Sequence, residues 1–172
     1  SRLHDSQEFT NFTIMCGYKG FKAHKVVVAA QSDYFRVACA HGRFAEGERN
    51  IILLGTHGDE PNAMGDVAGG DDPEVIELMI GFFYHYDYMI STGTPSNRTT
   101  GSSQCRITHA KLFAAAVKYQ VPGLRALALS KFEQAAKLAW QDASFAEAVR
   151  VVYKSTLDEV RELRDVIRRT SM

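Results

Sequence analysis

The order of apolar and polar residues between positions 12 and 36 predicts two strands followed by two short helices. Residues 12–16 (Phe-Thr-Ile-Met-Cys) are apolar or β-branched, and residues 17–20 (Gly-Tyr-Lys-Gly) supply turn chemistry before the next apolar run, which is typical of a β-hairpin. Apolar residues then recur at helical spacing at Val27, Ala30, Tyr34 and Phe35. Because Ser32 and Asp33 can cap a helix, we expect the helical segment to be divided there.

A further helix is predicted after Asp72. Asp72 can cap this helix, Pro73 suits its first turn, and Glu74 suits the positive end of the helix dipole. One face of the helix is apolar and contains Val75, Met79, Phe82, Phe83 and Tyr86. The aromatic run at residues 82–88 has no basic residue interleaved, which favours core packing over base stacking.

From Thr108 onward the chain is predicted to be helical. Pro122 and Gly123 divide two apolar stripes, which contain Leu112, Phe113, Ala116 and Tyr119 in the first and Leu124, Leu127, Ala128, Phe132, Ala135 and Ala136 in the second. Two capping boxes follow, at residues 144–147 (Ser-Phe-Ala-Glu) and 156–159 (Thr-Leu-Asp-Glu). Each opens a short amphipathic helix, so the chain is expected to end in a helix pair.

Two stretches have the composition of loops. Residues 55–70 contain five glycines but no following Lys-Ser or Lys-Thr pair, so a flexible surface insertion is favoured over a phosphate-binding loop. Residues 91–103 contain eight Ser or Thr together with Gly and Pro, which indicates a disordered segment.

Length and composition favour one domain with a short extension. The 172 residues are 45% hydrophobic and 23% charged, and twenty basic residues balance twenty acidic ones. This balance gives no net field to attract nucleic acid or an anionic membrane, and no apolar run approaches the roughly 20 residues that span a bilayer. Three widely spaced cysteines, Cys16, Cys39 and Cys105, argue against a disulfide framework, so a soluble protein of the cytoplasm or nucleus is expected.

No catalytic constellation is present in the sequence. The six histidines are scattered, and there is no nucleophile elbow, no zinc-protease motif and no nucleotide loop. We therefore expect no enzyme activity, no cofactor, no metal and no small-molecule substrate. An enzyme with a site in residues 55–70 is the least favoured alternative.

One set of residues in the first hairpin and helix forms a recognisable pattern: Phe12-Thr13-Ile14, Phe21, Ala23-His24, Val27, Ala29-Ala30, Ser32 and Tyr34-Phe35. This pattern resembles the BTB (POZ) domain, and the similarity continues in order through residues 49–54, 72–84 and 114–124. Residues 49–54 (Arg-Asn-Ile-Ile-Leu-Leu) look like the family's next strand, the third in this chain. The similarity covers about residues 9 to 135. No repeat or zinc-finger domain accompanies the match in these residues, an arrangement that resembles the stand-alone BTB proteins of filamentous fungi. Asn11 is a departure, because the family usually has Asp before the Phe-Thr-Ile strand.

The resemblance implies an α+β fold in which a small mixed sheet is covered by a cluster of helices. We expect a BTB/POZ domain at residues 1–140, with flexible insertions at about residues 55–70 and 89–106. Residues 141–172 are then a C-terminal helical extension. At the strand-helix corner, the resemblance gives His24 a structural role.

The resemblance also implies a function in protein–protein interaction. BTB adaptors of cullin-based ubiquitin ligases carry an apolar-x-Glu segment before the third strand, and Phe44-Ala45-Glu46 has that form and place. Phe44 and Glu46 are therefore the candidate partner-binding residues and a cullin the candidate partner, although Phe44 could instead fold back as a local core residue. The alternative function is homo-oligomerisation, with a homodimer as the product, in a transcription regulator or scaffold protein.

Overall fold

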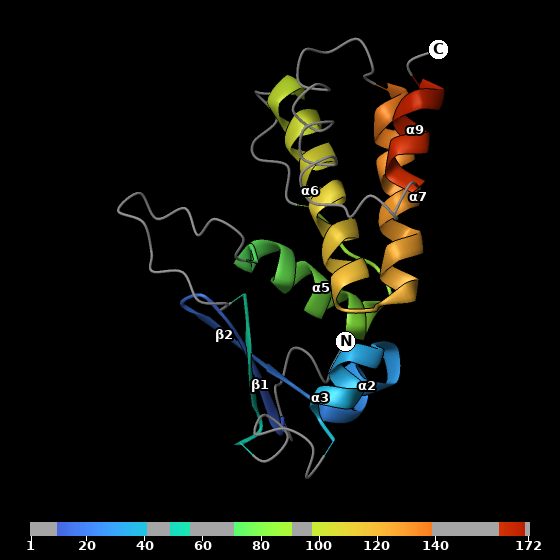
Figure 1. Ribbon diagram of the computed structural model, residues 1–172. Helices are drawn as coiled ribbons and strands as arrows, with labels where there is room; N and C mark the ends of the chain where they lie inside the picture. Colours follow the sequence, from blue (N-terminus) through green and yellow to red (C-terminus); the bar gives the residue numbers. More distant parts are fainter. Residues whose placement is uncertain (1–9, 41–48, 56–70, 91–97, 139–161, 171–172) are drawn as a thin grey trace. The chain divides into compact units, whose positions relative to one another are not determined.

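The computed structural model describes residues 10–40, 49–55, 71–90, 98–138 and 162–170. The chain divides into two compact units (Figure 1), an N-terminal unit at Ser1–Tyr86 and a C-terminal unit at Asp87–Met172. The N-terminal unit holds the described strands and the C-terminal unit is built from helices. The fold is α+β, as the sequence predicted.

The sheet of the N-terminal unit has three strands, β1 (Phe12–Cys16), β2 (Lys19–Ala23) and β3 (Ile51–Leu54), in the order β2-β1-β3. β1 pairs antiparallel with β2 and parallel with β3, so the sheet is mixed. The predicted hairpin is confirmed. Its turn is shorter than expected, because Lys19 and Gly20 already belong to β2 and only Gly17, at a φ of 56°, and Tyr18 lie between the strands.

The two faces of the sheet differ. Phe12, Ile14 and Cys16 of β1 are buried on one face, together with Ile52 and Leu54 of β3. On the opposite face, β3 exposes Ile51 and Leu53 to 44% and 61%. The alternation follows from the period of two in a strand, since successive side chains point to opposite faces.

Two short helices, α2 (Lys25–Gln31) and α3 (Asp33–Ala38), follow the hairpin. Ser32 divides them, because its backbone is extended and its Oγ accepts a hydrogen bond of 3.1 Å from the N–H of Phe35. A side-chain oxygen in this position satisfies a donor that the first turn of the helix leaves open. The predicted division of the helical segment is confirmed.

The start of α2 is capped from a distance. Its N-cap residue, His24, makes no side-chain cap bond. Instead the Oδ1 of Asn11 accepts a hydrogen bond of 2.9 Å from the backbone N–H of Lys25. Asn11, the residue that departs from the family pattern, therefore serves as an acceptor at a helix N-terminus, where Asp would be equally suited.

We expect Asn11→Ala to lower the free energy of unfolding by about 1 kcal/mol, because the N–H of Lys25 loses its acceptor. Asn11→Asp keeps the acceptor and adds a negative charge at the positive end of α2, so this variant should match or exceed the wild type by up to about 0.5 kcal/mol. Urea unfolding followed by circular dichroism measures both. If Asn11→Asp destabilised the protein as much as Asn11→Ala, the capping role would be wrong.

Helix α5 (Pro73–His85) begins as predicted, with the Oδ1 of Asp72 accepting a hydrogen bond of 3.0 Å from the N–H of Glu74. Its buried residues are Val75, Ile76, Met79, Ile80, Phe82 and Phe83. Tyr86 was wrongly placed on this face: it is 71% exposed. The reason is that the helix ends at His85 and Tyr86 turns into the left-handed region at a φ of 56°, which removes it from helical spacing.

The C-terminal unit contains α6 (Arg98–Lys118), α7 (Pro122–Leu138) and α9 (Glu162–Thr170). Within this unit α6 and α7 pack along each other, and α9 packs on α7 (Figure 1). Most members of the predicted stripes are buried: Leu112, Phe113, Ala116, Tyr119, Leu124, Ala128, Phe132 and Ala136. Leu127 and Ala135, which were predicted for the second stripe, are only half-buried.

Helix α6 begins at Arg98, earlier than the predicted start at Thr108. The hydroxyl of Thr108 donates a hydrogen bond of 2.9 Å to the carbonyl of Gln104, so this residue lies inside the helix instead of capping it. Arg106 and His109 are buried, and they extend the packed stripe toward the N-terminus. Residues 98–106, expected as part of a Ser/Thr-rich loop, are therefore helical, whereas residues 91–97 lie outside the described residues.

The remaining predicted segments are only partly described. The Gly-rich insertion lies at residues 56–70 and the predicted boundary near residue 140 lies within residues 139–161, both outside the described residues. The first helix of the predicted C-terminal pair also lies there. The second is represented by α9, in which Leu163 and Val166 are buried.

Candidate partner-binding regions

The candidate contact residues, Phe44 and Glu46, lie in residues 41–48, outside the described residues. The chain on both sides of this segment is well anchored within the N-terminal unit. At its start the N–H of Cys39 donates to the carbonyl of Phe35 at 2.8 Å, and at its end the carbonyl of Asn50 accepts from the N–H of Thr13 at 2.8 Å. The segment therefore leaves from the end of α3 and returns at the beginning of β3.

The base of this segment is held by aromatic packing. Phe35 of α3 is fully buried, and its ring lies edge-on to Phe83 of α5 at 5.9 Å between centroids. The side-chain amide of Gln31 donates a hydrogen bond of 2.6 Å to the carbonyl of Phe83. Helices α2 and α3 are thus fixed to α5, which gives the segment a firm base.

His24 forms a corner contact with Tyr84. The backbone N–H of His24 donates to the Tyr84 hydroxyl oxygen at 3.0 Å, and the Nδ1 of its ring lies 2.9 Å from the same oxygen. The Tyr84 hydroxyl accepts a hydrogen bond from the backbone with its oxygen and can at the same time donate its hydrogen to the Nδ1 of His24. Burial raises the pKa of Tyr84 above its ordinary value, which keeps the hydroxyl protonated as this arrangement requires. His24 therefore has a positioning role at the start of α2.

Two exposed apolar side chains of β3, Ile51 and Leu53, lie on the outer face of the sheet, and the sequence did not reveal their exposure. Besides Ile51 and Leu53, the side chains of Tyr18 in the hairpin turn and Val26 in α2 are exposed. This exposure was not predictable from β3 itself, because an unbroken run of four apolar residues is typical of a strand buried on both faces.

In the C-terminal unit, an ion pair attaches α9 to α7. The guanidinium Nη2 of Arg125 donates to both carboxylate oxygens of Glu162, at 2.5 and 2.7 Å. The same guanidinium lies 5.8 Å from the ring centre of Phe113. Together with the buried Leu163 and Val166, these contacts hold the described part of the C-terminal extension on the helices before it.

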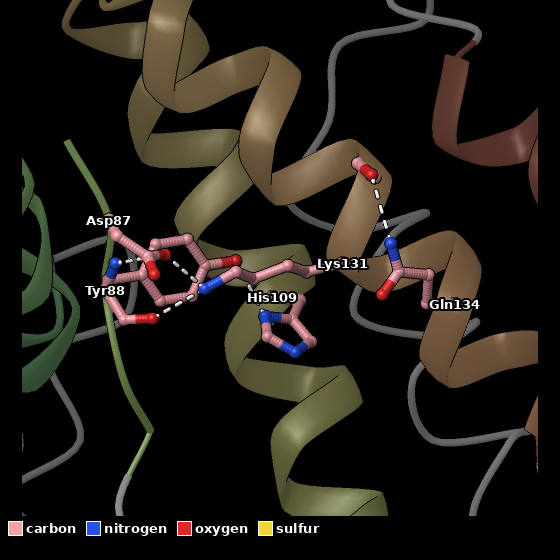
Figure 2. A network of polar contacts seen from close by, with 6 residues as sticks. Asp87, Tyr88, His109, Lys131 and Gln134 are labelled. Atoms are coloured by element: carbon pink, nitrogen blue, oxygen red, sulfur yellow. Dashed lines mark hydrogen bonds and ion pairs between the residues drawn. The ribbon is translucent and has the colours of Figure 1, made fainter.

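A second polar cluster lies at the start of the C-terminal unit (Figure 2). The ammonium of Lys131 donates to the Oδ1 of Asp87 at 2.5 Å and to the carbonyl of Tyr88 at 2.7 Å, and it lies 4.2 Å from the ring centre of Tyr88. The hydroxyl of Tyr88 lies 2.7 Å from the Nδ1 of His109. We call Asp87, Tyr88, His109 and Lys131 the Tyr88 cluster. Sequence reasoning missed it, because its members are separated along the chain.

The described residues were also searched for other kinds of site. They contain no group of three or more His, Cys, Asp and Glu side chains arranged to hold a metal ion. No helix in the described ranges has the length and apolar character to cross a bilayer. Cys16, Cys39 and Cys105 form no disulfide bond within the described residues, and burial raises the pKa of both Cys39 and Cys105.

A hairpin, a pair of short helices and a third strand parallel to the first define the N-terminal unit as a small α+β domain. Residues 1–64 match the family model of the BTB/POZ domain, which supports a BTB domain in this part of the chain. A comparison with curated proteins gave no match. BTB domains generally mediate protein–protein interactions and dimerisation rather than catalysis, so the match supports a protein-interaction module.

Proposed function

We propose that this protein is an adaptor that binds the N-terminal helical repeat of a cullin in a ubiquitin ligase of the cytoplasm or nucleus. The observation that carries the proposal is the place of Phe44-Ala45-Glu46 in the BTB unit. It lies between α3 (Asp33–Ala38) and β3 (Ile51–Leu54), where BTB adaptors of cullin ligases carry an apolar-x-Glu segment.

The chemistry of the triplet suits such a contact. An aromatic side chain in a pocket of the partner is the usual source of binding energy at a protein interface. A neighbouring carboxylate sets the register and speeds association with a basic partner surface. The anchored ends of the segment support this role, since a segment held at both ends loses less conformational entropy on binding than a free peptide.

The C-terminal helices support the proposal as a second contact. In many BTB adaptors, helices directly after the domain widen the surface that meets the cullin. The packing of α9 on α7 through Leu163 and the Arg125–Glu162 pair provides a folded element of this kind.

The test is size-exclusion chromatography with light scattering on the protein mixed with the cullin N-terminal repeat. We expect a complex with the wild type, and binding weaker by about thirtyfold or more (about 2 kcal/mol) for Phe44→Ala and Glu46→Arg. Glu48→Arg is the matched control, because it makes the same charge change two residues beyond the triplet and should bind almost normally. The absence of a wild-type complex, or an equal loss in all three variants, would contradict the proposal.

A second candidate function is homo-oligomerisation, and the exposed Ile51 and Leu53 of β3 favour it. β3 pairs with β1 on one side only within the described sheet. The backbone groups on its other side and its exposed apolar side chains can therefore bind another chain. Light scattering on the protein alone would then give the mass of a dimer or larger species, and Leu53→Lys would reduce that mass to one chain. A monomeric wild type rules this candidate out.

A further inference from the structure

The Tyr88 cluster holds the chain that leaves α5 against two helices of the C-terminal unit. Its anchor is the ring of Tyr88, which is 5% exposed and lies between Lys131 on α7 and His109 on α6. The backbone is fixed as well, since the N–H of Tyr88 donates to the Oδ1 of Asp87 at 2.8 Å and its carbonyl accepts from Lys131. One lysine ammonium therefore supports both the side chain and the backbone of a two-residue segment.

His109 is buried, at 9% exposure, and lies near the ammonium of Lys131. Burial and the ammonium of Lys131 lower the pKa of its imidazole from 6.5 to about 4. The ring is therefore neutral at pH 7. In that state its Nδ1 can accept from the Tyr88 hydroxyl, whereas a protonated ring can only donate.

The groups that face His109 leave it no anionic partner among the cluster members. Tyr88 contributes a hydroxyl, and burial raises the pKa of that hydroxyl far above its ordinary value, so it stays neutral. Lys131 contributes a positive charge, and the carboxylate of Asp87 is already paired with Lys131. On α6 itself, the buried Arg106 lies one turn before His109 and adds a further positive charge.

We propose that the Tyr88 cluster is an acid-sensitive latch, which opens when His109 takes up a proton and releases Asp87 and Tyr88 from α6 and α7. An imidazolium inside the closed latch would face Lys131 and would force the Tyr88 hydroxyl to change from donor to acceptor. Opening exposes His109 to water, which stabilises its charged form. This device goes beyond the adaptor function and does not depend on it.

The direction of the effect follows from proton linkage. The open state binds a proton with the ordinary pKa of 6.5, and the closed state binds it only near pH 4. The closed latch is therefore fully stable above pH 6.5 and loses stability as the pH falls from 6.5 to 4. The pKa of Asp87 is lowered below its ordinary 3.8 by its hydrogen bond from Lys131, so this carboxylate stays charged across the whole window and does not cause the change.

Hydrogen exchange followed by mass spectrometry tests the latch. After correction for intrinsic exchange, we expect the protection of the amides in residues 88–90 to fall about fiftyfold between pH 7 and pH 4.5, as a pKa shift from 6.5 to about 4 requires. His109→Gln keeps a hydrogen-bonding group but carries no titratable charge, so its protection should fall less than about threefold. His85→Gln is the matched control: it removes an exposed histidine of α5 and should respond like the wild type.

An equal loss of protection in wild type and His109→Gln, or no loss in the wild type, would overturn the proposal. If His109→Gln does not fold at pH 7, NMR of the wild-type protein decides instead. The imidazole resonance of His109 should then titrate with a midpoint below pH 5, together with a shift of the Tyr88 ring resonances. A midpoint near 6.5, or a Tyr88 ring that does not respond, overturns the latch.

Discussion

Replacing Gly55 with alanine should lower the free energy of unfolding by about 3 kcal/mol. Gly55 follows β3 with a φ of 76°, a conformation that costs a residue with a side chain about 1–2 kcal/mol. A Cβ at this position would also lie 2.7 Å from the backbone nitrogen of Asp71 and 3.2 Å from its carboxylate. Backbone atoms cannot rotate away, so the chain must shift, which adds about 1–3 kcal/mol.

Urea unfolding of Gly55→Ala, followed by circular dichroism, measures this effect, and Gly81→Ala is its control. Gly81 lies inside α5, and a Cβ built on it meets no atom within 4 Å. The same chemical change should therefore raise the free energy of unfolding by about 0.5–1 kcal/mol, because alanine favours a helix interior over glycine. Equal stability of the two variants would show that Gly55 and Asp71 do not approach each other in solution.

Replacing Lys131 with methionine is expected to lower the free energy of unfolding by about 2–3 kcal/mol. Methionine keeps most of the side-chain volume, so the loss comes from the ammonium. Without the ammonium, Asp87 loses its ion pair, the carbonyl of Tyr88 loses a donor, and the ring of Tyr88 loses a cation on its face. A charge-assisted hydrogen bond is worth about 1.5–3 kcal/mol and a cation over an aromatic ring about 0.5–1 kcal/mol.

Lys137→Met is the matched control on the same helix. Lys137 is largely exposed and forms an ion pair of 3.1 Å with Glu133 one turn away, so its removal should cost less than about 0.5 kcal/mol. Thermal or urea unfolding compares the two variants directly. A similar, small effect of both substitutions would show that the Tyr88 cluster contributes no more than a surface ion pair.

The parts of the fold that depend on neighbouring residues were predictable from the sequence. The hairpin, the division at Ser32 and the start of α5 at Asp72 are set by turn and cap chemistry within a few positions. Each of these features is stabilised by a hydrogen bond between residues close in sequence. Such signals remain readable without knowledge of the tertiary structure.

Features that depend on distant partners could not be predicted. The sequence indicated that Asn11 could accept or donate a hydrogen bond, but only the structure identifies its partner as Lys25, fourteen residues away. The early start of α6 has a similar cause, because buried residues such as Arg106 extend a helix through Ser- and Thr-rich sequence. Tertiary packing overrides composition in such segments.

The candidate sites also differ in whether a signal for them is present in the sequence. Phe44 and Glu46 were selected from a pattern and its place along the chain, and they remain predictions. The Tyr88 cluster brings together residues from a connecting segment, α6 and α7, and a sequence gives no signal for a contact between single residues of three elements. The resemblance to a family directs attention to known surfaces, and a cluster of residues from distant positions is then found only in the structure.

The contact between Gly55 and Asp71 also has a practical consequence for protein engineering. Two residues that touch in the folded state hold the ends of the intervening sequence together, whatever its length. Each doubling of that length costs only about 0.6 kcal/mol of closure entropy. An epitope tag or a fluorescent reporter inserted between Gly55 and Asp71 should therefore leave the sheet of the N-terminal unit intact.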